Sequence, residues 1–172
     1  MTRLLSLPAL SRAVLAKARE VGLTIATAES CTGGMVMVNL TAIAGSSDVV
    51  DRGFVTYSNA AKAAMLGVPM PLIERVGAVS AEVAAAMAEG ALKASGAGLA
   101  VAITGIAGPG GGSAAKPVGL VHLAAVSRFG DVNRIERRYE PALGRAGIRR
   151  AATQDALTML LDLAQRAGTQ PT

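Results

Sequence analysis

Apolar runs of strand length alternate with segments of helical pattern, and this alternation limits the possible folds more than any other feature of the sequence. Three such runs span residues 23–28, 99–104 and 118–126. Elsewhere apolar residues recur every three or four positions, as over residues 7–21 and 80–93, which is typical of amphipathic helices. Strands that are apolar on both faces are usually covered by helices on both sides. The pattern therefore predicts an α/β fold, a three-layer α/β/α sandwich with a mixed, mostly parallel sheet.

The remaining segments complete this prediction. We expect helices over residues 7–21, 32–44, 59–66, 80–93 and 148–163, with a short helical turn from residue 71. We expect strands over residues 23–28, 53–57, 99–104, 118–126 and 132–139. The last of these is more polar than the others, which indicates an antiparallel or edge strand. With 172 residues, no internal repeat and no linker, the chain is expected to form one domain, 1–172, with its core over about 8–166.

The charge and the amino-acid composition limit which kinds of molecule the chain can bind. The formal net charge is +5, which could favour nucleic acid or a phosphorylated small substrate. The basic residues are mostly scattered and only 2% of the chain is aromatic, which argues against a stacking platform for nucleic acid. No apolar run approaches the roughly 20 residues that span a bilayer. The single cysteine, Cys31, excludes an internal disulfide and agrees with a reducing compartment, so we expect a cytoplasmic protein.

The first candidate site is the segment 28–34, where a buried strand ends and a helix begins. In open α/β sheets, ligands bind in the crevice beyond the carboxyl ends of the strands. The free N–H groups at a helix start can hold an oxyanion formed by attack of Ser30. Three readings stay open at this point: Ser30 is a nucleophile, Ser30 or Thr32 merely caps the helix, or Cys31 is the nucleophile because a thiol is intrinsically more reactive.

A serine nucleophile needs a base. The only histidine, His122, lies in the middle of a predicted strand, so a Ser-His-Asp triad is disfavoured. A lysine whose pKa is lowered by burial is the other way to activate a serine. Lys62 is the candidate, because it lies one turn into a helix that starts at a strand end; the alternative is a solvated surface lysine. Tyr57 could orient Lys62 or relay its proton, or could be a buried aromatic that closes the strand.

The second candidate site is the glycine-rich segment 104–113, which follows a predicted strand. Successive glycines let backbone N–H groups approach an anion closely. The spacing matches neither the Walker A motif nor the dinucleotide fingerprint, and a merely flexible connection is the alternative. Lys116, just beyond, could pair with a phosphate or with acidic groups nearby.

Six motifs in fixed order resemble the CinA C-terminal domain family, over about residues 8–165. They are ESCTGG at 29–34, AGSS at 44–47, RGFVTYSNxxK at 52–62, GAVS at 77–80, TGIAGP at 104–109 and KPVG at 116–119. The stand-alone members of that family are nicotinamide-nucleotide amidohydrolases. In many relatives the domain is fused to an N-terminal pyrophosphatase-like domain, whose activity is not expected here.

The resemblance implies hydrolysis of nicotinamide mononucleotide to nicotinate mononucleotide and ammonia, in pyridine-nucleotide salvage and NAD metabolism. It implies a Ser30/Lys62 pair with Tyr57 beside it, a three-layer fold and a homodimer. No cofactor is expected, and no metal either, since one His and one Cys give no ligand spacing for zinc. The residues expected to bind substrate are Glu29, Cys31, Thr32, Gly33, Thr104, Gly105, Ala107, Gly108, Lys116 and Arg145.

Within that set the roles are less sharply defined. Backbone N–H groups near residues 31–32, or around 104–105, would hold the oxyanion, and the 5′-phosphate would rest on the glycine loop with Arg145 or Lys116 as its charge partner. Two positions depart from the family pattern: Gly110 and Gly144 stand where relatives often carry an acidic residue. The competing hypotheses are a non-catalytic nucleotide-binding module, a scaffold in DNA uptake or repair, and an amidohydrolase acting on a different amide.

Overall fold

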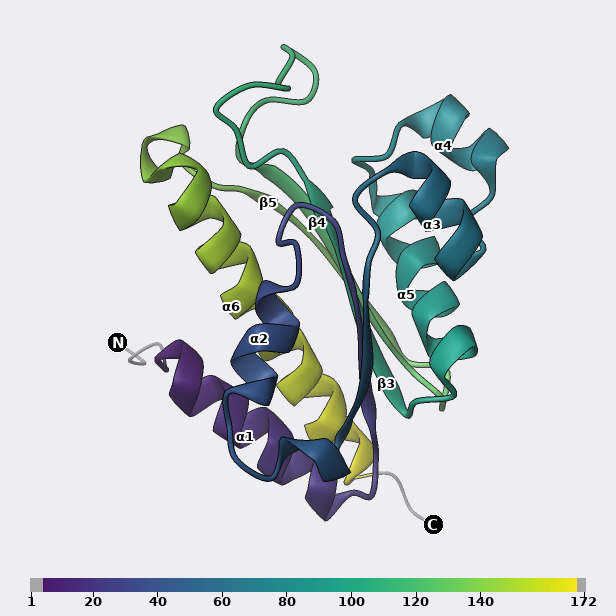
Figure 1. Ribbon diagram of the computed structural model, residues 1–172, viewed down its shortest axis with the longest axis vertical. Coiled ribbons are helices and arrows are strands. Elements are labelled where there is room, and N and C mark those ends of the chain that lie inside the picture. Colours follow the sequence, from purple (N-terminus) through teal and green to yellow (C-terminus); the bar gives the residue numbers. More distant parts are fainter. Residues whose placement is uncertain (1–4, 170–172) are drawn as a thin grey trace.

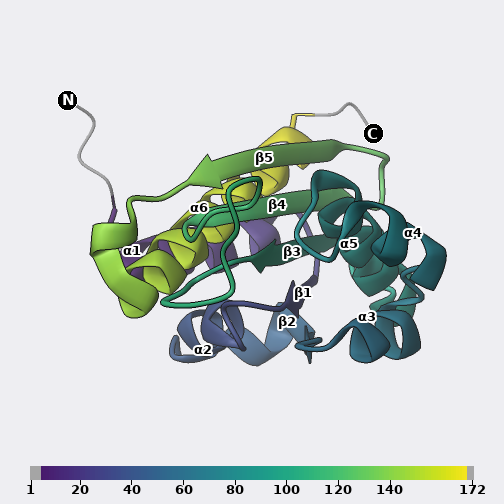
Figure 2. The same ribbon diagram turned by 90° about the horizontal axis from the view of Figure 1, so that it is seen from above.

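Five strands form one mixed sheet in the order β2-β1-β3-β4-β5 in the computed structural model, which describes residues 5–169 (Figure 1). They are β1 (Ile25–Glu29), β2 (Val50–Val55), β3 (Leu99–Gly105), β4 (Leu120–Ser127) and β5 (Val132–Arg138). β1 pairs in parallel with β2 and β3, whereas β4 pairs antiparallel with β3 and β5. Only β4 therefore runs against the other strands of the sheet. Figure 2 shows β2 and β5 at its two edges.

Helices cover both faces of the sheet. One layer holds α1 (Leu7–Glu20), α2 (Met35–Thr41) and α6 (Gly144–Ala167), and the other holds α3 (Asn59–Leu66), α4 (Met70–Val76) and α5 (Ala81–Ser95) (Figure 1). Two short 3-10 helices, η1 (Ser46–Asp48) and η2 (Pro141–Leu143), lie in connections. The predicted three-layer sandwich with a mixed sheet is confirmed. None of the helices in residues 5–169 combines the length and apolarity that crossing a membrane requires.

The two faces of the sheet carry side chains of different size, because successive residues of a strand point to opposite faces. Toward α1 and α6 the strands present bulky residues such as Ile25, Leu99 and Val101. Toward α5 they present mainly alanines, such as Ala26 and Ala100. Small residues on that face let α5 lie close to the sheet, so the alanine-rich composition has a packing reason.

Two predicted boundaries differ from the structure. The helix expected over 32–44 begins only at Met35, because Gly33 and Gly34 adopt positive φ angles of 59° and 99° and form a turn instead. The strand expected over 53–57 runs from Val50 to Val55. Asp51 and Arg52, which follow the first residue of this strand, are polar and exposed at the sheet edge, so they interrupt the apolar pattern that would mark the strand start. The segment 132–139, predicted to be an antiparallel or edge strand, forms β5, which is antiparallel to β4 and lies at the sheet edge.

Candidate active site

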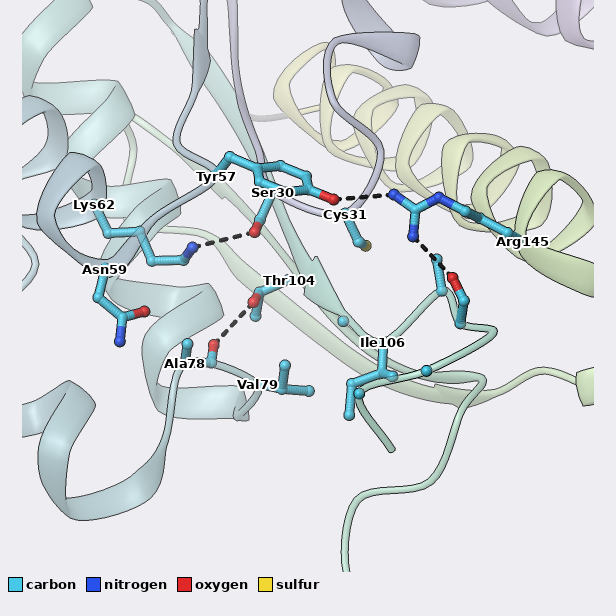
Figure 3. Close-up of a pocket in the computed structure, with 15 residues that line it drawn as sticks. Ser30, Cys31, Tyr57, Asn59, Lys62, Ala78, Val79, Thr104, Ile106 and Arg145 are labelled. Carbon is cyan, nitrogen blue, oxygen red and sulfur yellow. Dashed lines mark hydrogen bonds between the residues drawn. The ribbon is translucent and has the colours of Figure 1, made fainter. Parts of the chain in front are cut away.

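A pocket of about 280 Å³ opens at the carboxyl ends of β1 and β3, and its volume is just below the range of roughly 300–1,000 Å³ for small-molecule sites. It lies where the sequence predicted a crevice, since the first residue after β1 and the last residues of β3 meet there (Figure 3). The lining residues are Ser30, Cys31, Tyr57, Asn59, Lys62, Ala78, Val79, Thr104, Gly105, Ile106, Ala107, Gly108, Gly110, Gly111 and Arg145.

Ser30 and Lys62 meet inside this pocket. Lys62 Nζ lies 3.1 Å from Ser30 Oγ and 2.9 Å from the carbonyl oxygen of Thr56. The Lys62 side chain comes from the first turn of α3, whose N-terminus is capped by Ser58, and points at Ser30 in Figure 3. Ser30 is held at the end of β1 by a hydrogen bond from its N–H to the carbonyl oxygen of Ile103. The alternative of a solvated lysine is thereby excluded, because Lys62 is only 1% exposed.

The surroundings of Lys62 favour the neutral amine. Burial lowers the pKa of Lys62, and no carboxylate in residues 5–169 forms a salt bridge with it. A neutral amine has two N–H donors and one lone pair. If one N–H donates to the Thr56 carbonyl, the lone pair is free to accept the proton of the Ser30 hydroxyl. The arrangement can therefore act as a base-activated serine.

Cys31 lines the same pocket, but its thiol is not activated as a nucleophile. Burial raises the pKa of Cys31 to about 11, and the nearby charge of Arg149 offsets only part of that rise. The reactive form of a cysteine is the thiolate. At neutral pH the thiol is therefore protonated, whereas Ser30 has an amine in hydrogen-bond contact. Of the two nucleophiles that the sequence left open, the geometry favours Ser30.

Glu29 has a structural role instead of the expected contact with substrate. Its carboxylate accepts hydrogen bonds of 3.0, 3.1 and 3.0 Å from the N–H groups of Gly34, Val36 and Met37. A carboxylate at this place satisfies the free donors at the start of α2 and complements the helix dipole. Glu29 is 1% exposed and lies outside the pocket lining. It thus fixes the far end of the turn that follows Ser30.

Lys116 is likewise placed differently from the expectation of a phosphate partner. Its Nζ donates to the carbonyl oxygens of Val76 and Val79, at 2.6 and 2.7 Å. Gly77 beside it has a φ of +81°, and a Cβ there would lie 2.7 Å from Lys116 Nζ. The ammonium therefore holds the backbone segment 77–79 against the pocket from outside and does not line the pocket itself.

Thr104 holds the same segment from inside. Its hydroxyl, which the sequence assigned to substrate binding, donates to the carbonyl oxygen of Ala78 at 2.8 Å (Figure 3). Ala78 and Val79 line the pocket opposite Ser30. Their apolar side chains did not indicate this role in the sequence. Thr104 and Lys116 together fix the position of this wall.

Arg145 and Tyr57 lie on the opposite side of the pocket. Arg145, at the start of α6, donates to the carbonyl oxygen of Gly108 and to the Tyr57 hydroxyl, both at 2.9 Å (Figure 3). The Tyr57 hydroxyl thus contacts Arg145 and makes no hydrogen bond with Lys62 in the described part of the chain, in contrast to the expected relay. No acidic side chain in residues 5–169 pairs with Arg145, so its charge is available at the pocket.

The predicted site residues divide into two groups. The structure brings Ser30, Cys31, Tyr57, Lys62, Thr104, Gly105, Ala107, Gly108 and Arg145 together around one pocket. It leaves Glu29, Thr32, Gly33 and Lys116 outside the lining. Asn59, Ala78 and Val79 line the pocket but were not predicted, while Ile106, Gly110 and Gly111 also line it and lay in the candidate segment 104–113 without being assigned to substrate. Asn59 follows the helix cap Ser58, and its place one turn before Lys62 was the one available signal.

The pocket does not contain the residues that a histidine-based triad would need. His122 is 8% exposed in the middle of β4, lies outside this pocket, and burial lowers its pKa. A serine–histidine triad is therefore excluded by position. In residues 5–169, no cluster of three or more His, Cys, Asp or Glu side chains is arranged to hold a metal ion.

Fold and pocket together define a class: three-layer α/β proteins in which a serine at the end of a central parallel strand meets a buried lysine from a helix that follows the neighbouring strand. The model of the CinA C-terminal domain family matches residues 8–164. The chain belongs to this family.

Known relatives agree in sequence and in structure. A CinA-like protein of Synechococcus sp. (strain RCC307) is 52% identical over 151 residues, which cover 88% of this chain and 36% of the relative. A CinA-like protein of Akkermansia muciniphila is 49% identical over 153 residues, 89% of this chain and 36% of the relative. The chain thus spans about a third of the length of these curated relatives.

Solved structures match over nearly their whole length. The competence/damage inducible protein CihA from Agrobacterium tumefaciens superposes with a TM-score of 0.90 at 53% identity, covering 95% of this chain and 99% of that one. A competence or damage-inducible protein from Enterobacter asburiae gives a TM-score of 0.87 at 31% identity, covering 93% and 99%.

Proposed function

We propose that this protein hydrolyses the carboxamide of nicotinamide mononucleotide to nicotinate mononucleotide and ammonia, with Ser30 as nucleophile and Lys62 as base. The observation that carries the proposal is the 3.1 Å contact between the buried amine of Lys62 and the Ser30 hydroxyl. An amide is a demanding substrate, because its nitrogen leaves only after protonation. A single base that accepts the serine proton and returns it to the leaving nitrogen meets this demand.

In the first half of the reaction, Lys62 accepts the proton of Ser30 as Oγ attacks the carboxamide carbon. The tetrahedral intermediate carries a negative charge on the former carbonyl oxygen, which backbone N–H groups near residues 31–32 or 104–105 stabilise. The Lys62 ammonium then protonates the nitrogen, the C–N bond breaks and ammonia leaves. The acid part of the substrate stays on Ser30 as an ester.

In the second half, Lys62 accepts a proton from water, and the hydroxide attacks the ester carbon. The ester bond breaks, the Ser30 oxygen recovers its proton from Lys62, and nicotinate mononucleotide is released. The sum is one amide and one water converted to one carboxylic acid and one ammonia. The Thr56 carbonyl, 2.9 Å from Lys62 Nζ, keeps the amine oriented through both halves.

Arg145 is the residue we propose for the 5′-phosphate. It is an arginine at the pocket without an acidic partner in the described chain, and it donates to two neutral oxygens that a phosphate would replace favourably. The adjoining residues Gly108, Gly110 and Gly111 leave room at the pocket wall. At the two positions that depart from the family pattern, Gly110 and Gly144, the chain has no side chain that could hinder a phosphate.

The test is ammonia release from nicotinamide mononucleotide. Ser30→Ala and Lys62→Ala should each abolish release with the fold intact, while Cys31→Ala should retain it. Loss of activity in Cys31→Ala with activity retained in Ser30→Ala would overturn the choice of nucleophile. A panel of nicotinamide, its riboside and the mononucleotide tests substrate scope, and Arg145→Gln should raise KM for the mononucleotide more than for the riboside.

Nucleotide binding without turnover would favour the alternative, a non-catalytic nucleotide-binding module. Binding to DNA with a steep dependence on salt would instead favour a role in DNA uptake or repair. The homodimer and the cytoplasmic location implied by the resemblance belong to the same proposal. Sedimentation of the purified chain and localisation of a tagged copy test them.

A further inference from the structure

A second arginine of α6, Arg149, grips the backbone that directly follows the nucleophile. Its Nε donates to the carbonyl oxygen of Cys31 at 3.0 Å, and its Nη2 donates to the carbonyl oxygen of Thr32 at 2.7 Å. The planar guanidinium fork can bind two successive carbonyl oxygens at once, which the single ammonium of lysine does less well. Arg149 is half-buried, and no acidic side chain in residues 5–169 pairs with it.

This grip determines the direction of the neighbouring N–H groups. In a trans peptide the C=O and the N–H point in opposite directions. When Arg149 draws the Cys31 carbonyl toward α6, the N–H of Thr32 in the same peptide turns away from α6. Within the described residues, the N–H of Thr32 makes no hydrogen bond, the N–H of Cys31 faces the thiol of Cys31 itself, and the N–H of Gly33 donates to the Ser30 carbonyl. One free donor, the N–H of Thr32, therefore lies in the turn that follows Ser30.

The turn is fixed from two sides. Glu29 holds its far end through the N–H groups of Gly34, Val36 and Met37, and Arg149 holds its middle through two carbonyl oxygens. Arg149 reaches it from 118 positions away along the chain. The first turn of α6 carries the basic residue Arg145 and no acidic residue. Cations are disfavoured at a helix N-terminus.

We infer that Arg149 is a positioning residue for catalysis: by holding the carbonyl oxygens of Cys31 and Thr32, it fixes the peptide that carries the free N–H of Thr32 and aims this N–H at the oxygen that becomes negative when Ser30 attacks. Its charge adds a favourable field at the same place. The inference rests on the proposed function in that it uses Ser30 as the attacking group, but it does not depend on which amide is the substrate.

The experiment compares Arg149→Gln and Arg149→Lys with the matched control Arg150→Gln. Arg150 is the next residue of the same helix and is exposed. With nicotinamide mononucleotide, Arg149→Gln should lower kcat about 100-fold with little change in KM, since lost oxyanion donors typically cost 10²–10³ in rate. Arg149→Lys should restore activity only in part, and Arg150→Gln should behave as the parent protein. An unchanged kcat in Arg149→Gln would overturn the inference.

A binding measurement separates positioning from a general structural role. The aldehyde analogue, in which CHO replaces the carboxamide, adds the Ser30 oxygen to its carbonyl carbon and places an oxygen where the oxyanion forms. Arg149→Gln should weaken this analogue about as much as it lowers kcat, while the affinity for nicotinate mononucleotide stays within about two-fold. Equal weakening of both ligands, or a lowered melting temperature that accounts for the lost activity, would mean that Arg149 only stabilises the fold.

A substrate-independent probe distinguishes failure of this inference from failure of the proposed function. A fluorophosphonate forms a bond from Ser30 Oγ to phosphorus and expels fluoride, with the serine proton passing to Lys62. Slower labelling in Arg149→Gln than in Arg150→Gln supports the inference even if nicotinamide mononucleotide is not deamidated, an outcome that overturns only the substrate. Equal labelling of the two variants, or no labelling of the parent protein, overturns the inference itself.

Discussion

Replacement of Lys62 by methionine should remove activity and, at the same time, change how stability depends on pH. Methionine keeps an unbranched side chain of similar length but has no base. General acid–base groups typically contribute 10²–10⁴ in rate, which corresponds to about 3–5 kcal/mol of barrier. We therefore expect kcat for ammonia release to fall at least 100-fold in Lys62→Met.

The effect on stability follows from burial of the amine. The folded state lowers the pKa of Lys62 from its usual 10.5, so between the folded value and 10.5 the unfolded chain binds a proton that the folded chain does not. The free energy of unfolding therefore rises with pH through this window. At pH values below the window Lys62 is protonated in both states, and burial of its charge lowers the free energy of unfolding by the full amount. Each unit by which the pKa is lowered corresponds to about 1.4 kcal/mol. No carboxylate in residues 5–169 forms a salt bridge with Lys62 that would offset this effect.

The assay is urea unfolding of both proteins at pH 7, 8, 9 and 10. Cys31 acts with the opposite sign, because burial raises its pKa from 9.0 to about 11 and stability falls above pH 9 as the unfolded thiol ionises. Because Cys31 is present in both proteins, its contribution largely cancels when the free energy of unfolding of Lys62→Met is subtracted from that of the parent. The parent should gain stability relative to the variant as pH rises from 7 to 10. A flat difference curve would refute the reasoning that Lys62 is uncharged in the folded protein.

Three further predictions concern the framework of the site. Cys31 should react with iodoacetamide at pH 8 far more slowly than a free cysteine, because its pKa of about 11 keeps the thiol protonated; labelling followed by mass spectrometry measures this, and rapid labelling would contradict it. Glu29→Gln should destabilise the protein by about 1–2 kcal/mol in urea unfolding and lower activity, since a charged acceptor of three N–H groups at the start of α2 is lost; unchanged stability would be inconsistent with that capping role. Gly90→Ala should lower the melting temperature strongly, because the added Cβ would clash with the carbonyl oxygen of Leu66. Gly110→Ala, whose Cβ would meet no atom within 4 Å, is the matched control and should change the melting temperature little.

Much of the architecture was predictable because it depends on local pattern. The apolar runs at residues 23–28 and 99–104 and the helical spacing between them are sufficient to indicate a layered α/β fold. The positions of Ser30 and Lys62 were predictable for the same reason. Each follows the end of a parallel strand, and such ends meet at one edge of the sheet, so the two residues were expected to be neighbours before any distance was known.

The roles of individual polar side chains were not predictable in this way. Lys116 and Glu29 belong to conspicuous motifs and were assigned to substrate, yet one holds backbone carbonyls and the other caps a helix. Val79 has no chemical signal at all and lines the pocket because Lys116 and Thr104 fix its segment there. A side chain's choice among several possible partners depends on distances that only packing sets.

The sequence by itself determined the succession of strands and helices along the chain and the end of the sheet at which a site could form. It also indicated the two residues, Ser30 and Lys62, that could act as a serine–lysine pair. Only the tertiary structure decided that the lysine is buried, that the thiol beside the serine is held protonated, and that Arg149 holds the turn after the nucleophile from 118 residues away. The physical reason is that pattern and propensity act over a few neighbouring residues. Burial, pKa and hydrogen-bond partners instead arise from segments that are distant in the chain and meet only when the layers pack.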